Sequence, residues 1–97
     1  MSTVRLKKDA QRDFDRLNRV NQKSILAKLK FLESDPCPDD SKELEGYAPL
    51  RRIKAVDVRA IYDPEPDSRD RIWVWRIGTD HSIYELDELF KEYRSDD

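Results

Sequence analysis

The sequence predicts an α+β fold: two N-terminal helices packed on a mainly antiparallel sheet of four to five strands, followed by a short C-terminal helix. Three observations lead to this prediction. Apolar residues repeat with helical spacing up to about residue 33, alternate with a period of two from residue 50 to 77, and return to helical spacing at residues 85–94. Helices and strands that are segregated in this way are typical of helices covering one face of a sheet. A length of 97 residues predicts a single domain over residues 1–97.

The helical part divides into two helices. The first is predicted over residues 7–18 and the second over residues 21–33, with Asn21 as N-cap and Asp35-Pro36 as a stop. The connection between them is short, so we expect an antiparallel hairpin. The apolar stripes are Ala10, Phe14 and Leu17 in the first helix, and Ile25, Leu29 and Leu32 in the second.

The strands are separated by turn-forming residues. Residues 38–48 are acidic and contain Pro38 and Gly46, so we expect a surface connection. The two prolines within residues 64–68 predict a turn, because proline cannot donate a hydrogen bond in a central strand. Strands are predicted over residues 3–6, 50–55, 56–63, 71–77 and 83–84.

Positive charge is concentrated in the predicted hairpin. Arg52 and Lys54 lie two residues apart and therefore project from the same face of a strand, and a turn near residues 56–57 folds Arg59 back towards them. Three cations on the sheet face that the helices leave open repel each other, which favours an anionic ligand, first of all a phosphodiester backbone. The alternative is a solvated face with acidic partners such as Asp57.

Composition narrows the class of protein. The net charge is −2, but residues 1–62 hold 14 Lys and Arg against 10 Asp and Glu, whereas residues 63–97 hold 5 against 11. A basic first part is compatible with a polyanion-binding face. The single Cys37 forms no internal disulfide, and the ligand count excludes a structural zinc site. We expect a cytosolic protein without cofactor, metal or membrane segment, since no apolar run is long enough to span a bilayer.

Two tryptophans, Trp73 and Trp75, share one face of the predicted strand at residues 71–77. Two interpretations stay open for them. They form core beneath the two helices, which is the more usual place for paired tryptophans on a central strand, or they form a stacking platform for nucleic acid.

Several short segments together resemble a known family. They are Phe14-Asp15-Arg16-Leu17, Ile25 to Leu32 followed by Asp35-Pro36, Leu44-Glu45-Gly46 with Leu50-Arg51-Arg52-Ile53, Val58-Arg59-Ala60-Ile61-Tyr62, and Ile77-Gly78 through Ile83-Tyr84. In this order and spacing they are similar to the RelE/ParE superfamily, the toxins of bacterial type II toxin–antitoxin pairs. The resemblance covers nearly the whole chain.

The resemblance implies one of two activities. RelE-like members cut mRNA in the ribosomal A site by attack of a ribose 2′-OH on the adjacent phosphate, whereas ParE-like members inhibit DNA gyrase. The cutting reaction needs a base, an acid and positive charge, but no metal. Carried over by position, the expected catalytic residues are Lys54, Arg59, His81 and Tyr84, and the expected substrate-binding residues are Arg51, Arg52 and Arg76.

One position departs from the family pattern. Where the family often has Gly-His-Arg, this chain has Gly78-Thr79-Asp80-His81, so a carboxylate stands at the usual arginine position. His81 is a candidate proton shuttle, because histidine titrates near neutral pH. Arg76 is a candidate for the missing positive charge. Tyr84 has three possible roles: packing, proton transfer, or stacking on a base.

These observations favour a ribosome-dependent mRNA endoribonuclease neutralised by a cognate antitoxin, with mRNA on the ribosome as substrate. The alternatives are a gyrase inhibitor, or a protein of this fold that has lost catalysis and only binds an antitoxin. In each case we expect a toxin–antitoxin hetero-oligomer whose antitoxin folds as it binds.

Overall fold

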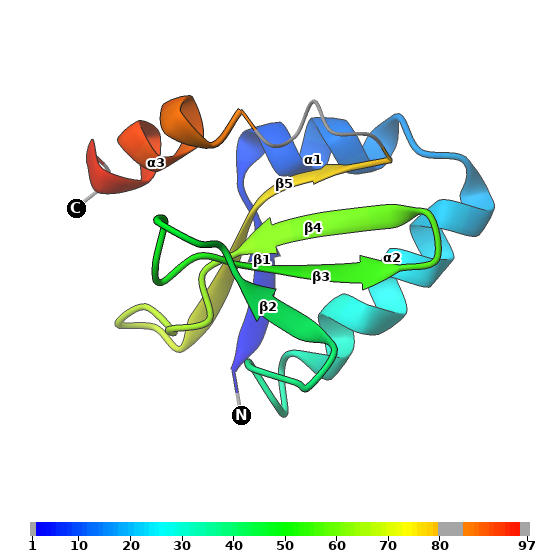
Figure 1. Ribbon diagram of the computed structural model, residues 1–97. Coiled ribbons are helices and arrows are strands. Elements are labelled where there is room, and N and C mark those ends of the chain that lie inside the picture. Colours follow the sequence, from blue (N-terminus) through cyan, green and yellow to red (C-terminus); the bar gives the residue numbers. More distant parts are fainter. Residues whose placement is uncertain (1, 80–84, 96–97) are drawn as a thin grey trace.

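Five strands form one sheet in the order β1-β5-β4-β3-β2 (Figure 1). The computed structural model describes residues 2–79 and 85–95. The elements follow one another as β1 (Thr3–Leu6), α1 (Lys8–Asp15), α2 (Arg19–Phe31), β2 (Ser41–Glu43), β3 (Arg51–Ala55), β4 (Val58–Tyr62), β5 (Arg71–Gly78) and α3 (Leu86–Ser95). The predicted α+β class is confirmed, with five strands. The predicted strand at residues 83–84 lies outside the described residues.

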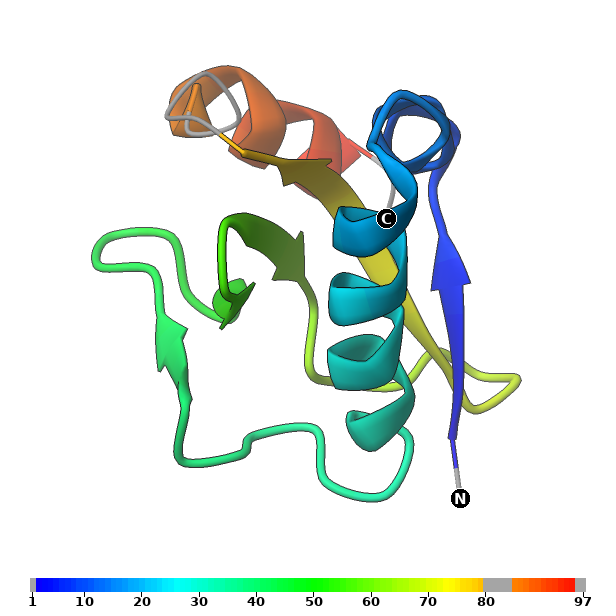
Figure 2. The same ribbon diagram turned by 90° about the vertical axis from the view of Figure 1, so that its right-hand side faces the viewer.

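The sheet is mostly antiparallel with one parallel pair. β2, β3, β4 and β5 pair antiparallel in turn, whereas β1 runs parallel to β5. β5 therefore has a neighbour on each side, which explains its long run of β-branched and aromatic residues. The sheet curves around α2, so that β1 lies on one side of this helix and β2 on the other (Figure 2). None of the described helices is long and apolar enough to cross a membrane.

The boundaries of both N-terminal helices differ from the prediction. α1 ends at Asp15 rather than at residue 18, and α2 begins at Arg19, two residues before the predicted start. The reason is the cap: the side chain of Asn18 accepts a hydrogen bond of 2.8 Å from the backbone N–H of Asn21. Asn18 is therefore the N-cap. The prediction of Asn21 in this role was wrong, because Asn21 lies at position N3 and its backbone N–H is the group that is capped.

The main core lies between the two helices and the sheet. α1 packs on β1 and β5, and α2 packs on β3 and β4. Because side chains alternate along a strand, one face of each strand is apolar and faces these helices. The fully buried members of this core are Ala10, Ile25, Leu32, Ile53, Val58, Ala60, Tyr62, Ile72 and Val74.

A second core lies on the opposite face of the sheet, where α3 packs. Its buried members are Leu44, Leu50, Ile61, Trp75 and Leu89. α3 and α1 lie on opposite sides of β5 (Figure 2). The expectation that this face is left entirely open was therefore wrong in part, because the apolar side of α3 needs a surface on which to be buried.

The second core also decides the place of the tryptophans. Trp75 is 7% exposed and packs edge-on against Tyr93 of α3, with 5.6 Å between the ring centres. Trp73 is half-buried, and its indole N–H donates to Asp67 at 2.8 Å. The prediction of core was correct for Trp75, but it lies beneath α3 and not beneath α1 and α2.

The connection between β4 and β5 is held by one carboxylate. Asp67 accepts hydrogen bonds from the Trp73 indole and the Arg71 guanidinium, both at 2.8 Å, and from the backbone N–H groups of Arg69 and Arg71. These donors, the Trp73 indole first among them, hold the pKa of Asp67 well below its usual value. The charged form is thus the one that orders this turn.

We expect the Asp67→Asn variant to be less stable than the wild type at neutral pH and to lose less stability in acid. A carboxyl with a lowered pKa stabilises the fold fully above its unfolded pKa of about 4, and this contribution is lost as the pH falls through the lower folded value. Urea unfolding at pH 7, 4 and 2.5 measures the difference. Equal acid sensitivity of the two proteins would contradict this role for Asp67.

Candidate functional site

Three cations of the central hairpin lie on one face of the sheet, and we call Arg52, Lys54 and Arg59 the cationic face. Lys54 of β3 stands directly opposite Arg59 of β4, and Arg52 stands opposite Ile61. Directly opposed Cβ atoms are about 5 Å apart, and residues i and i+2 of a strand point the same way. Ile61 belongs to the second core, so the cationic face lies on the same side of the sheet as α3.

The hairpin turn brings these residues together. Ala55 pairs with Val58, which leaves Val56 and Asp57 as a two-residue turn. Val56 has a φ of 54°, a left-handed conformation that is strained for a β-branched residue, and it is 74% exposed. The predicted turn at residues 56–57 is confirmed, and it places Arg59 beside Lys54.

No carboxylate neutralises the cationic face within residues 2–79 and 85–95. None of the ion pairs in this part of the chain includes Arg52, Lys54 or Arg59. Lys54 is exposed, and both arginines are half-buried. Like charges directly opposite each other destabilise a sheet, so an anion that bridges them would relieve their repulsion.

One neighbour of this face carries no side chain. Gly78 of β5 stands opposite Arg59 on the side away from Lys54. Any other residue at this register position would place a side chain on the same face, about 5 Å from that of Arg59. Gly78 therefore places no side chain beside the Arg59 guanidinium at this register position.

Arg51 lies on the other side of the strand from Arg52. Its Nε donates to Ser41 Oγ at 3.1 Å, and its Nη2 donates to the carbonyl oxygen of Ser41 at 3.2 Å. Neighbouring residues of a strand point to opposite faces, so the structure does not bring Arg51 into the cationic face. Tyr62 lies near this pair, and burial raises the pKa of its hydroxyl, which donates to the carbonyl oxygen of Pro36.

Arg76 forms an internal ion pair. Its Nε donates to Asp13 Oδ2 at 2.7 Å and its Nη2 donates to Asp13 Oδ1 at 3.2 Å. The Asp13 carboxylate raises the pKa of Arg76, which stays protonated and neutralised. The structure therefore provides no free charge at Arg76 to replace the arginine that the family pattern has near Asp80.

The two proposed proton-transfer residues, His81 and Tyr84, lie outside the described residues. The segment that carries them begins directly after Thr79, the last described residue beyond β5. Sequence reasoning missed three residues beside the cationic face: Asp13, which contacts Arg76, Gly78, and Lys42 of β2, which stands opposite Arg52. For Gly78 the sequence offered only its place in the Ile77-Gly78 segment of the family resemblance, and nothing in the sequence pairs Asp13 with Arg76.

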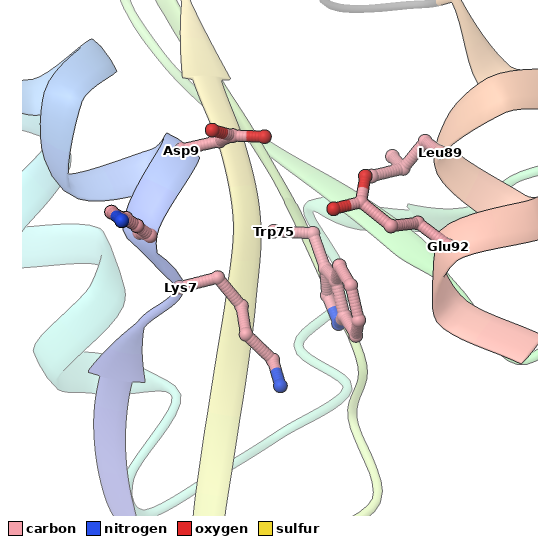
Figure 3. A pocket seen from close by; sticks show the side chains of 6 residues that line it. Lys7, Asp9, Trp75, Leu89 and Glu92 are labelled. Atoms are coloured by element: carbon pink, nitrogen blue, oxygen red, sulfur yellow. The ribbon is translucent and has the colours of Figure 1, made fainter. Parts of the chain in front are cut away.

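A small cavity of about 210 Å³ lies apart from the cationic face, between the start of α1 and α3 (Figure 3). Lys7, Asp9, Trp75, Leu89 and Glu92 line it, together with Lys8. The Lys7 ammonium lies 4.6 Å from the centre of the Trp75 ring and 4.5 Å from that of a second indole, so cation–π contact already occupies these rings. This cavity is a junction between elements rather than a preformed ligand site.

No metal site is formed by the described part of the chain, where no three histidine, cysteine or carboxylate side chains come together. Independently of this, the positive charges of the cationic face can bind an anion and stabilise negative charge that develops on it.

Solved structures of known proteins have a similar fold. The isolated Escherichia coli RelE toxin is 17% identical, with a TM-score of 0.70 over 91% of this chain and 96% of that one. The toxin–antitoxin complex RelBE2 from Mycobacterium tuberculosis has 20% identity and a TM-score of 0.67 over 81% of this chain and 98% of that one. The archaeal RelE–RelB complex from Pyrococcus horikoshii has 23% identity and a TM-score of 0.64 over 80% and 93%.

The fold is thus that of the RelE toxins. A family model described as the ParE toxin of the type II toxin–antitoxin system parDE matches residues 4–84. The chain belongs to this toxin family, within the RelE/ParE superfamily, and is the toxin component of a type II toxin–antitoxin system. No curated protein sequence matches it significantly.

Proposed function

We propose that this toxin is an endoribonuclease that cleaves mRNA on the ribosome, in the cytoplasm, and so stops translation. One observation carries the proposal: Arg52, Lys54 and Arg59 share a face of the sheet, and no described carboxylate pairs with them. A face that held these charges only for solubility would gain from acidic neighbours. The described residues instead leave this charge uncompensated, which supports a phosphate as its partner.

The proposed step is a transesterification. The 2′-oxygen of a ribose forms a bond to the adjacent phosphorus while the bond from phosphorus to the 5′-oxygen breaks. A base takes the proton of the 2′-OH and an acid protonates the departing 5′-oxygen, so that a 2′,3′-cyclic phosphate and a 5′-OH result. The reaction is balanced without a metal ion.

The three cations would supply the electrostatic part of this catalysis. Arg59 and Lys54, which stand opposite each other, would contact two oxygens of one phosphate and stabilise the negative charge of its pentavalent state. Arg52 lies diagonally from Arg59 and would hold the neighbouring part of the backbone. We propose His81 and Tyr84 for proton transfer or base stacking.

A second candidate is inhibition of DNA gyrase. The family model that matches the chain is that of the ParE toxin, and Asp80 stands where RelE-like members often have arginine. In this case the cationic face would bind protein or DNA without cutting it. A toxin fold that only binds its antitoxin is the third candidate.

One experiment separates these functions. The chain is induced in cells, new 5′ ends are mapped on translated mRNA, and plasmid supercoiling is measured in the same cultures. We expect 5′-OH ends inside reading frames that vanish when initiation is blocked, with supercoiling unchanged. Loss of supercoiling without new ends would select gyrase, and neither effect would leave only antitoxin binding.

We further propose that a cognate antitoxin covers this toxin. The M. tuberculosis and P. horikoshii relatives are solved as toxin–antitoxin complexes. An antitoxin segment that folds on the toxin would cover the cationic face. It would supply carboxylates to Arg52, Lys54 and Arg59, which pair with none of the described carboxylates.

A further inference from the structure

Asp13 joins helix α1 to the end of strand β5. Its carboxylate accepts two hydrogen bonds from Arg76, at 2.7 and 3.2 Å, and a third from the backbone N–H of Ile77 at 3.0 Å. The Asp13 side chain is 11% exposed and that of Arg76 is 32% exposed. Three donors thus satisfy one nearly buried carboxylate, and loss of these bonds would leave the Asp13 carboxylate unsatisfied.

The Asp13 contact lies directly beside the cationic face. Ile77 pairs with Ala60 of β4, and the next residue, Gly78, pairs with Arg59. The pairing of β4 with β5 is irregular at Ile61 and Tyr62, so the register of the last β5 residues is not fixed by an unbroken ladder. A side chain from outside the sheet holds this end in place.

The same strand end leads into the segment that carries the proposed proton-transfer residues. Gly78 and Thr79 are the last described residues before residues 80–84. The point at which Asp13 acts is one residue away from Gly78.

We propose that Asp13 is a positioning residue for the nuclease site: it holds Gly78 opposite Arg59. Asp13 acts through Ile77 and Arg76 and touches no substrate. This inference rests on the proposed nuclease function. It also assigns Arg76 to the support of the site and removes it from direct substrate binding.

The test compares two isosteric variants of α1. Asp13→Asn keeps the size of the side chain but removes the charge that binds Arg76. Asp15→Asn makes the same change at an exposed carboxylate of α1, which accepts a hydrogen bond from Gln11 at 3.0 Å. Cleavage of mRNA on programmed ribosomes is measured below the unfolding temperature of every variant. We expect kcat of Asp13→Asn to fall about 10- to 100-fold with KM nearly unchanged, because small misplacements of catalytic groups have effects of this size. Asp15→Asn should match the wild type.

A further variant separates positioning from stability. The double variant Asp13→Ala with Arg76→Ala leaves no unpaired charge and is expected to stay folded, yet to show the same loss of kcat. Full activity of this double variant would overturn the proposal. So would a loss of activity in Asp13→Asn that follows only the fraction of folded protein, or an equal loss in Asp15→Asn.

NMR spectroscopy tests the positioning role of Asp13 without any measurement of mRNA cleavage. In ¹⁵N-labelled protein, the amide resonances of Ile77, Gly78 and Arg59 should shift in Asp13→Asn and stay in place in Asp15→Asn. If the wild type cuts no mRNA, the proposed function fails, and these resonances still show whether Asp13 positions Gly78. Unchanged Gly78 and Arg59 resonances in Asp13→Asn would refute the positioning role by themselves.

Discussion

Replacing Lys54 and Arg59 together by alanine should abolish cleavage of ribosome-bound mRNA and leave the fold intact. The two side chains stand opposite each other on β3 and β4. Removing one preorganised electrostatic contact to a transition state commonly slows a reaction about 100- to 1,000-fold, so the double variant should lose at least ~1,000-fold in rate. Stability should be unchanged or slightly higher, because two opposed like charges are removed.

The matched control for this variant is Lys23→Ala with Lys30→Ala on helix α2. Both lysines are exposed, and the net charge changes by the same amount on another surface. Cleavage rates on programmed ribosomes and thermal unfolding are measured for both double variants. Full activity without Lys54 and Arg59, or an equal loss in the control, would show that the cationic face is not the phosphate site.

The largest expected change in stability is for Trp75→Ala. Trp75 fills the second core between β5 and α3, and truncation of a buried tryptophan costs about 3–5 kcal/mol of unfolding free energy. This is a large part of the 5–15 kcal/mol that is usual for a domain. α3 should lose its packing surface, which hydrogen exchange measures as faster exchange at residues 86–95.

Trp75→Phe separates the packing of the ring from the burial of the indole N–H. The indole N–H of Trp75 is buried and has no hydrogen-bond partner among the residues described. Phenylalanine loses some packing but removes this unsatisfied donor, whose burial costs about 1–3 kcal/mol. We expect Trp75→Phe to lie within about 1.5 kcal/mol of the wild type in urea unfolding. A loss as large as that of Trp75→Ala would show that the N–H has a partner.

Periodicity was sufficient for most of the fold. The helical spacing of Ala10 and Phe14, and of Ile25 and Leu29, predicted two helices that the structure confirms, because local chain geometry sets which residues share a face. The start of α2 was predicted at Asn21 and not after Asn18. The choice between these two asparagines depends on which side chain reaches a backbone N–H of the first helical turn, and the sequence does not show this. β2 was missed because its three residues form a strand only by pairing with β3.

The candidate site was predicted only where it depends on strand geometry. Alternation placed Arg52 and Lys54 together, and the turn at residues 56–57 added Arg59; the structure has the same arrangement. The absence of acidic partners could not be read from sequence, because Asp57 and other carboxylates were equally close along the chain. The pairing of Arg76 with Asp13, 63 residues apart, likewise depends on the packing of α1 against β5.

By itself the sequence determined the α+β class, the single cationic face and the resemblance to toxins of the RelE/ParE superfamily. These follow from the order and spacing of side chains, which fix faces within an element. Only the tertiary structure decided which of the described cations pair with a carboxylate. It also decided that Trp75 of β5 packs against α3. Contacts between elements distant in the chain are set by packing, so Asp13 neutralises Arg76, whereas Arg52, Lys54 and Arg59 have no ion-pair partner among the described residues.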